Sequence, residues 1–276
     1  MKKVAKRCAV ILMAAAIFLG TAAGQAATGD GSLQRVKDAG KLTIGAEGNW
    51  VPYVYNDVKD NDALKGFEVD IAKEVAARLG VKAEFNISNK WDGVIAGLDA
   101  KRYDTVICGV TPNPDRRQKY NLSISYTESP VCLVVAKSNK DINSFDDLKG
   151  KLCGNSLTSS SGNIARSYGA RLTDVSLTQA MDLLVTGRID AHINNLTAIS
   201  EYLNNKPNTA VRIAAIYKPK ESWEIEEAVM LRKEDNSLAA AINDALKAMI
   251  ADGTCYRLAE KYFGKLVADG ISIYKK

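Results

Sequence analysis

The residues best suited to binding chemistry form one short run, from Cys108 to Arg116. Thr111 and Arg116 stand five residues apart, across a proline-bearing turn that leads from a predicted strand into a helix. In open α/β sheets ligands bind beyond the carboxyl ends of strands, and a guanidinium fork can bind both oxygens of one carboxylate. The alternative is that Arg116 is a solvated helix residue, like Arg117. The spacing would allow Thr111 and Arg116 to converge on one carboxylate, and both interpretations stay open from the residues alone.

A second polar run, Thr158 to Gly162, lies between another predicted strand and a helical stretch that continues from Asn163. Hydroxyl groups and free backbone amides at the start of a helix form a concavity that binds anions. A plain serine N-cap is the alternative, and it needs only one of the three serines Ser159, Ser160 and Ser161.

Aromatic residues are the third candidate feature. Trp50 and Tyr53 follow the first predicted strand, and Trp91 opens a helical pattern. Aromatic side chains stack well on ligands, but tryptophan is more often a core residue. Both interpretations stay open from the residues alone.

The hydrophobic pattern predicts an α/β scaffold for these groups, because short apolar runs alternate with helical patterns from residue 41 onward. Helical stripes are expected at 91–98, 238–249 and 256–262, and a short capped helix at 144–150. Strands are expected at 42–44, 83–87, 105–108, 131–136, 152–153, 191–193, 211–215 and 228–231.

The run from Gly66 to Leu79 carries the most information about family. A turn glycine precedes a helix whose apolar residues recur at i, i+3, i+4 and i+7, and Glu68 and Asp70 lie in its first turn, where the helix dipole favours acids. By itself this pattern is typical of a surface helix. The order glycine, aromatic, acid, aliphatic, acid, aliphatic resembles the signature of the family 3 extracellular solute-binding proteins, which deliver amino acids to ABC importers.

The resemblance implies a periplasmic-binding-protein fold, with two α/β lobes joined by two crossover strands that act as a hinge. Applied to this chain, lobe one comprises residues 27–130 and 222–276, and lobe two comprises residues 131–221. The ligand is expected in the cleft between the lobes, which closes around it. No cofactor is implied.

The resemblance also implies roles for individual residues. An arginine that matches Arg116 binds the ligand α-carboxylate, assisted by the hydroxyl residue Thr111 and by backbone groups near Cys108 and Gly109. The serine loop, Ser159 to Ser161, completes this clamp from lobe two.

Further positions concern the ligand side chain. Aromatic residues that match Trp50 and Trp91 sandwich it, and Glu47 aligns with a position that sets selectivity. An acid at Glu47 favours a basic or hydrogen-bonding ligand, although simple solvent exposure explains it equally well.

One position departs from the family pattern. The lead-in from Gly187 to Asp190 is intact, but Asn195 stands where many members have the aspartate that binds the ligand ammonium. An amide oxygen can accept a hydrogen bond from an ammonium, but it does not neutralise the charge. Either Asp190, Glu47 or another acid compensates, or the ligand is not an ordinary α-amino acid.

The cysteines and the single histidine give no metal pattern. Cys108, Cys132, Cys153 and Cys255 are widely spaced, and His192 is the only histidine, so no metal site is expected. Four cysteines allow three full pairings. The resemblance places Cys132 and Cys153 in one small sheet and thus favours that disulfide; buried free thiols are the alternative.

The N-terminus predicts export. Four basic residues precede an apolar run at 9–19 and small residues up to Ala26, which is the layout of a secretory signal peptide cleaved near Ala26. The run is shorter than the roughly 20 residues that span a bilayer. Removing residues 1–26 lowers the net charge of the chain from +5 to +1, so neither nucleic acid nor an anionic membrane is expected as a partner.

These observations predict a monomeric periplasmic binding protein that carries an amino acid or a related carboxylate to an ABC permease in the inner membrane. Polar uncharged amino acids are the first expected ligands, and no catalysis is expected. Two alternatives stay open: an enzyme similar to the cyclohexadienyl dehydratases that use this fold, with Glu47 as its acid, and a protein that reports ligand to a membrane receptor.

Overall fold

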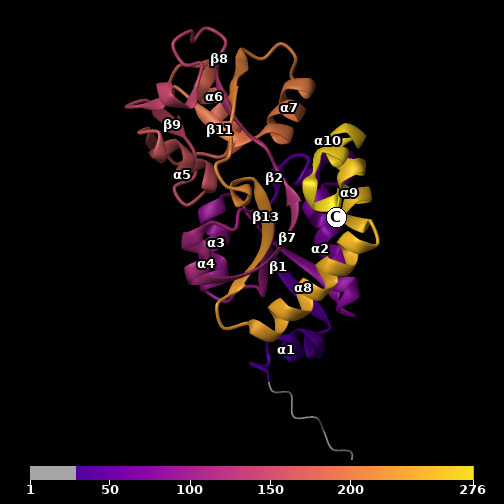
Figure 1. Ribbon diagram of the computed structural model, residues 1–276. Coiled ribbons are helices and arrows are strands. Elements are labelled where there is room, and N and C mark those ends of the chain that lie inside the picture. Colours follow the sequence, from indigo (N-terminus) through magenta and orange to yellow (C-terminus); the bar gives the residue numbers. More distant parts are fainter. Residues whose placement is uncertain (1–28, 276) are drawn as a thin grey trace, which may run out of the picture.

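The computed structural model describes residues 29–275, which form two α/β lobes (Figure 1). The predicted signal peptide, residues 1–26, lies outside the described residues. Among the described helices, none is both long enough and apolar enough to cross a membrane.

The first lobe is built on a five-stranded sheet in the order β5-β1-β6-β13-β7. Strand β1 pairs in parallel with β5 and β6, whereas β13 runs antiparallel to both β6 and β7. Strand β13 returns from the far end of the sequence and inserts between two earlier strands. The bounds are β1 (Lys41–Glu47), β5 (Lys82–Ser88), β6 (Thr105–Val110), β7 (Tyr120–Glu128) and β13 (Glu226–Arg232).

Helices pack on both faces of this sheet (Figure 1). One face is covered by the apolar sides of α2, α8 and α9, and the other by α3, whose buried Val94 and Leu98 follow the predicted stripe. The bounds are α1 (Ser32–Ala39), α2 (Phe67–Arg78), α3 (Trp91–Asp99), α4 (Pro114–Lys119), α8 (Asn236–Ala251), α9 (Thr254–Phe263) and α10 (Lys265–Gly270), with η1 (Val58–Asp60) and η4 (Ser272–Lys275) and the small sheet β2 (Asn49–Trp50), β3 (Val54–Asp57) and β4 (Ala63–Lys65).

The second lobe is smaller. The central strand of its three-stranded sheet is β8, which pairs antiparallel with β11 and β12. A parallel pair, β9 and β10, joins this sheet through a bridge between Cys153 and Ala191. The bounds are β8 (Val131–Ala136), η2 (Phe145–Leu148), β9 (Leu152–Gly154), α5 (Ser160–Ser167), β10 (Arg171–Thr173), α6 (Leu177–Val185), β11 (His192–Asn195), α7 (Leu196–Asn205) and β12 (Val211–Ile216).

The chain passes between the lobes twice, from β7 to β8 and from β12 through η3 (Ser222–Glu224) to β13. The two crossings lie side by side, because the Ser129 amide donates to the Ile225 carbonyl at 2.6 Å. This arrangement has the form of a two-stranded hinge. The domain boundaries at 130/131 and 221/222 stay a prediction.

All eight expected strands are present, with ends within three residues of those expected, and the long stripe at 238–249 lies within α8. The short capped helix is the single turn η2, and it carries a capping box between Ser144 and Asp147. The pattern missed β7, β10 and the small sheet β2-β3-β4.

The expected Cys132–Cys153 disulfide is wrong, because all four cysteines in the described residues are free and buried. Side chains alternate between the two faces of a strand. Cys132 and Val134 of β8 pack on the face that contacts α6 and α7, whereas Cys153 packs with Val131 and Leu133 on the opposite face. The two thiols are therefore separated by the sheet itself.

Candidate functional site

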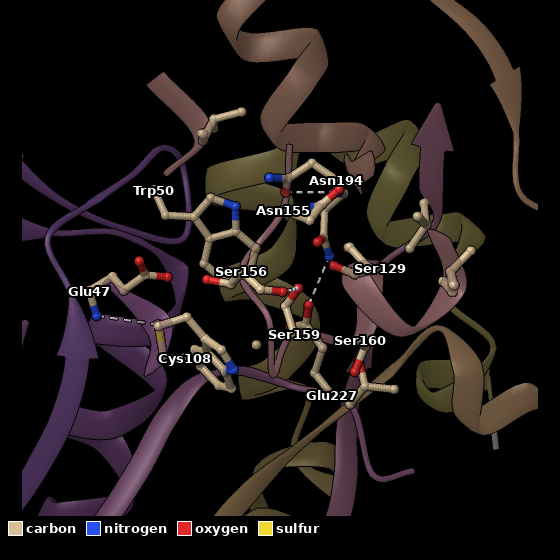
Figure 2. Close-up of a pocket in the computed structure, with 18 of the residues that line it drawn as sticks. Glu47, Trp50, Cys108, Ser129, Asn155, Ser156, Ser159, Ser160, Asn194 and Glu227 are labelled. Atoms are coloured by element: carbon tan, nitrogen blue, oxygen red, sulfur yellow. Dashed lines mark hydrogen bonds between the residues drawn. The ribbon is translucent and has the colours of Figure 1, made fainter. Parts of the chain in front are cut away.

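A cavity lies between the lobes, where the ends of β1 and β6 face the loop that follows β9 and the residues of β11 (Figure 2). All eleven residues predicted for the site line this one cavity, although they come from many separate segments of the chain. Their role in binding stays a prediction. They are Glu47, Trp50, Trp91, Cys108, Gly109, Thr111, Arg116, Ser159, Ser160, Ser161 and Asn195.

Arg116 is held in place by groups from both lobes. It lies in the first turn of α4, where the Asn113 side chain caps the helix by accepting from the Arg116 amide at 2.8 Å. Its Nη1 donates to the Thr111 carbonyl at 3.0 Å and to Ser160 Oγ at 3.2 Å, and its Nη2 donates to the Thr158 carbonyl at 3.1 Å. Thr111 thus contacts Arg116 through its backbone rather than through its hydroxyl.

The Arg116 guanidinium is a buried cation with no acid beside it. The residue is 8% exposed, and among the described residues no carboxylate forms an ion pair with it. Burial lowers its pKa to about 10, so it stays charged at neutral pH. The Trp91 ring lies below it, with its centroid 5.1 Å from Cζ. An unpaired buried charge is costly, so this site is suited to receive an anion.

The serine loop combines the two roles weighed from the sequence. Ser159 is the N-cap of α5: its Oγ accepts from the Gly162 amide at 3.0 Å and donates to the Ser156 carbonyl at 2.9 Å. Ser160 contacts Arg116 instead, and Ser161 lines the cavity without a cap role. One serine, Ser159, therefore caps the N-terminus of α5, and the other two serines face the cavity.

The aromatic wall is formed by Trp50, which stacks on Tyr53 with ring centroids 4.1 Å apart. Tyr53 itself is 1% exposed and lies behind Trp50 in the core, so it does not line the cavity. Gly109 has a φ of 61°, and a Cβ there would lie 2.3 Å from the Trp50 ring. The glycine is required both by its backbone and by the ring packed against it.

Acidic groups line another part of the cavity wall. Glu47 ends β1, and its amide donates to Cys108 Sγ at 3.5 Å (Figure 2). Burial, together with the nearby charge of Asp92, raises the pKa of Glu47 to about 7. Burial also keeps the Cys108 thiol protonated by raising its pKa.

Glu227 is a second acid of the cavity, and the sequence did not indicate it. It belongs to the returning strand β13, and its Oε1 accepts a hydrogen bond from Asn195 Nδ2 at 3.1 Å, across the two lobes. Asp190, one of the acids considered for the ammonium, does not line the cavity; it accepts from the Leu152 amide at 2.7 Å. Thus Asn195 lies beside an acid from a distant part of the chain.

His192 also lines the cavity, but both of its ring nitrogens contact neighbouring groups of the protein. Its Nδ1 contacts the Gly154 carbonyl at 2.5 Å, and its Nε2 contacts Asn194 Nδ2 at 3.1 Å. Burial lowers its pKa to about 4, so the ring is neutral at physiological pH. In residues 29–275 no group of three or more His, Cys, Asp or Glu side chains is placed to hold a metal ion.

Other lining residues escaped the sequence analysis because no distinctive motif marks them, whether they lie in the crossings, in loops or at the ends of helices and strands. Asn155 is an example: it cross-links the Ile193 backbone in both directions, at 2.8 and 3.2 Å. In the sequence, the only signal for a position such as Asn155 is that it follows the end of a predicted strand. The remaining residues are Asn49, Ser129, Val131, Ser156, Ile164, Val175, Ser176, Leu177, Asn194, Glu224 and Ile225.

Comparisons with known proteins match most of the described chain. Residues 42–265 match the family described as bacterial extracellular solute-binding proteins, family 3. The chain is 38% identical over 242 residues to the L-cystine-binding protein TcyA of Bacillus subtilis (strain 168), covering 87% of each chain. It is 37% identical over 240 residues to the L-cystine-binding protein TcyJ of Escherichia coli (strain K12), covering 85% of this chain and 87% of TcyJ.

Solved structures share the fold. An ancestral arginine-binding protein bound to arginine superposes with a TM-score of 0.73 at 33% sequence identity, covering 82% of this chain and 99% of the other. The two curated relatives and the ancestral protein are all binding proteins for amino acids.

Proposed function

Because the chain belongs to the bacterial extracellular solute-binding proteins of family 3, we propose that it binds an amino acid between its lobes and presents it to the permease of an ABC importer. The protein acts as a monomer in the periplasm after cleavage near Ala26. Ligand contacts that exist only when the lobes are closed shift the protein toward the closed state. No bond of the ligand is broken.

The ligand we propose is L-cystine. Two relatives with 37–38% identity are L-cystine-binding proteins. Cystine carries no net charge at neutral pH, so it narrows the expected class of polar uncharged amino acids. The cavity offers what such a zwitterion needs, a cation at Arg116 and acids at Glu47 and Glu227.

The single observation that carries the proposal is the buried Arg116 guanidinium, which is presented to the cavity by both lobes without an acid partner. A ligand carboxylate supplies the missing anion. Its two oxygens match the planar guanidinium fork.

The test is isothermal titration calorimetry with L-cystine. Removing one member of a buried charge pair costs about 2–5 kcal/mol, so Arg116→Ala should weaken binding by about 30-fold or more. Arg117→Ala is the matched control, because Arg117 is exposed, donates to the Pro112 carbonyl and does not line the cavity. Equal affinities of the two variants would show that the carboxylate clamp is wrong.

Arginine is the second candidate ligand. The acids Glu47 and Glu227 of the cavity favour a cationic side chain, and a structural neighbour binds arginine. Direct competition distinguishes the two ligands. If the cavity prefers a cation, unlabelled L-arginine displaces bound L-cystine at a lower concentration than unlabelled L-cystine does. Absence of turnover is tested separately, by incubating the protein with prephenate and arogenate.

A further inference from the structure

Two buried carboxylic acids meet behind the cavity. Glu68 lies in the first turn of α2 and is 0% exposed; Glu227 lies in β13 and is 2% exposed. Glu68 Oε2 accepts from the Tyr126 hydroxyl at 2.5 Å, and Glu227 Oε1 accepts from Asn195 Nδ2 at 3.1 Å. Each acid thus has one oxygen satisfied by a neutral donor.

The other two oxygens, Glu68 Oε1 and Glu227 Oε2, are buried and find no donor among the described residues. The charge of Glu227 raises the pKa of Glu68, so the two acids lie close enough to interact. Two neighbouring buried carboxylates are not both ionised, so the pair holds one proton. That proton supplies the donor that the orphaned oxygens lack.

The proton resides on Glu68. Burial and the adjacent Glu227 raise the pKa of Glu68 well above its usual range. Burial also raises the pKa of Glu227, but hydrogen bonds from Glu68, Ser129 and Asn195 oppose this and leave it at about 7. Glu227 is therefore ionised above neutral pH, and it is the member of the pair that lines the cavity.

Other titratable groups near Glu227 stay uncharged at neutral pH. Tyr53, Cys108, Tyr126 and Tyr274 all face the acid pair from different elements, and burial raises the pKa of each. The negative charge on this wall is therefore that of Glu227. Arg116 lines the same cavity and supplies the positive charge.

We propose that Glu227 is the carboxylate that binds the ligand ammonium, that Asn195 orients it, and that protonated Glu68 is a positioning residue that holds it from behind. The inference rests on the proposed function. It gives Asn195 a physical role: an aspartate there would face Glu227 with a second negative charge, whereas an amide donates a hydrogen bond to it.

The first test compares L-cystine with 3,3′-dithiodipropionic acid, which keeps the disulfide and both carboxylates but lacks the ammonium groups. Glu227→Gln should weaken cystine binding by about 30-fold or more, while leaving the affinity for the deaminated analogue unchanged or higher. Glu226→Gln is the matched control, because Glu226 precedes Glu227 on the same strand, accepts from Ser125 Oγ at 2.6 Å and does not line the cavity.

The second test needs no Glu227 variant. If Glu227 must be ionised to bind ammonium, cystine binding near pH 7 releases protons, which calorimetry in buffers of different ionisation enthalpy measures directly. The release should persist in Glu47→Gln, which removes the other lining acid whose pKa is raised to about 7. Loss of the proton release in Glu47→Gln would overturn the assignment to Glu227.

The role of Glu68 is separated from mere packing by two substitutions. Glu68→Gln keeps a donor toward Glu227 and should keep cystine affinity within about threefold of wild type. Glu68→Leu removes the donor and therefore raises the pKa of Glu227. The pH at which cystine affinity reaches half of its maximum should then move to a higher value. Identical pH profiles for both variants would reject the positioning role.

The outcomes also distinguish this inference from the proposed function. If the wild-type protein binds no amino acid, the proposed function fails. If it binds cystine but Glu227→Gln and Glu226→Gln bind equally well, only the assignment of Glu227 fails.

Discussion

Single residues set the charge of the cavity. Arg116 is a buried cation that forms no ion pair within residues 29–275, and Glu47 and Glu227 are acids whose pKa values burial raises to about 7. The walls of the cavity therefore carry charges that the surrounding protein does not compensate. Ligand binding is favoured partly because the ligand supplies the missing counter-ions.

Glu47 should make the ligand-free protein less stable as pH rises. Its pKa is about 4.5 when unfolded and about 7 when folded, so the folded state binds more protons between these values and loses stability as pH increases across them. Glu47→Gln removes this loss. At pH 8 the variant should be more stable by on the order of 1 kcal/mol, or about 2–4 °C in Tm.

Thermal unfolding of ligand-free protein at pH 5 and pH 8 measures the effect. Glu84→Gln is the control, because Glu84 is exposed and pairs with Lys41 at the surface. A wild-type protein that gains as much stability as Glu47→Gln between pH 5 and pH 8 would contradict the role given to Glu47.

At the scale of elements, the glycine that opens α2 explains why the family signature begins with that residue type. Gly66 has a φ of 130°, and a Cβ there would lie 2.1 Å from the Tyr53 carbonyl oxygen. The first amides of α2, those of Phe67 and Glu68, donate to the Pro52 and Tyr53 carbonyls at 3.0 and 2.9 Å. Only glycine lets the helix start so close to this loop.

Gly66→Ala should therefore destabilise the protein by about 3 kcal/mol or more, since it combines a backbone conformation nearly restricted to glycine with a clash against backbone. Gly150→Ala is the control: Gly150 also has a positive φ, 75°, but nothing lies within 4 Å of its added Cβ. Urea unfolding compares the two. A loss for Gly66→Ala no larger than that for Gly150→Ala would refute the close-contact explanation.

The sequence predicted features that depend on neighbouring residues and missed those that depend on distant ones. The turn from Thr111 to Arg116 and the serine loop are local, and both lie at the cavity. Strand β7 was missed because Asn121, Ser123 and Ser125 alternate with apolar residues, as is typical of a half-buried edge strand, so the segment contains no continuous apolar run. The role proposed for Glu227 depends on Glu68 and Asn195, which only the fold brings to it.

At the scale of the whole molecule, the described conformation has its lobes in contact outside the cavity as well as across it. Lys90 Nζ, at the start of α3, pairs with Asp174 Oδ2 of the other lobe at 2.8 Å, and the Asp92 carboxylate accepts from Thr158. These contacts form only when the lobes are close. These contacts therefore stabilise the closed conformation independently of the ligand.

The Lys90–Asp174 pair should affect every ligand equally. Neither residue lines the cavity, so Lys90→Met changes only the fraction of molecules that close, and apparent affinity scales with that fraction. An exposed ion pair contributes up to about 1 kcal/mol, which limits the loss to about fivefold. L-Cystine and any second ligand that binds should lose the same factor, because the variant does not touch either of them.

This equality separates closure from recognition, since Glu227→Gln should instead change the ratio of affinities for cystine and its deaminated analogue. Lys119→Met is the control, because Lys119 pairs with Asp99 within one lobe at 2.8 Å and cannot oppose opening. Calorimetry at low and high salt checks the electrostatic origin: screening should weaken the wild type toward the level of Lys90→Met. A ligand-dependent loss in Lys90→Met would show that the pair acts on the cavity itself and not on closure.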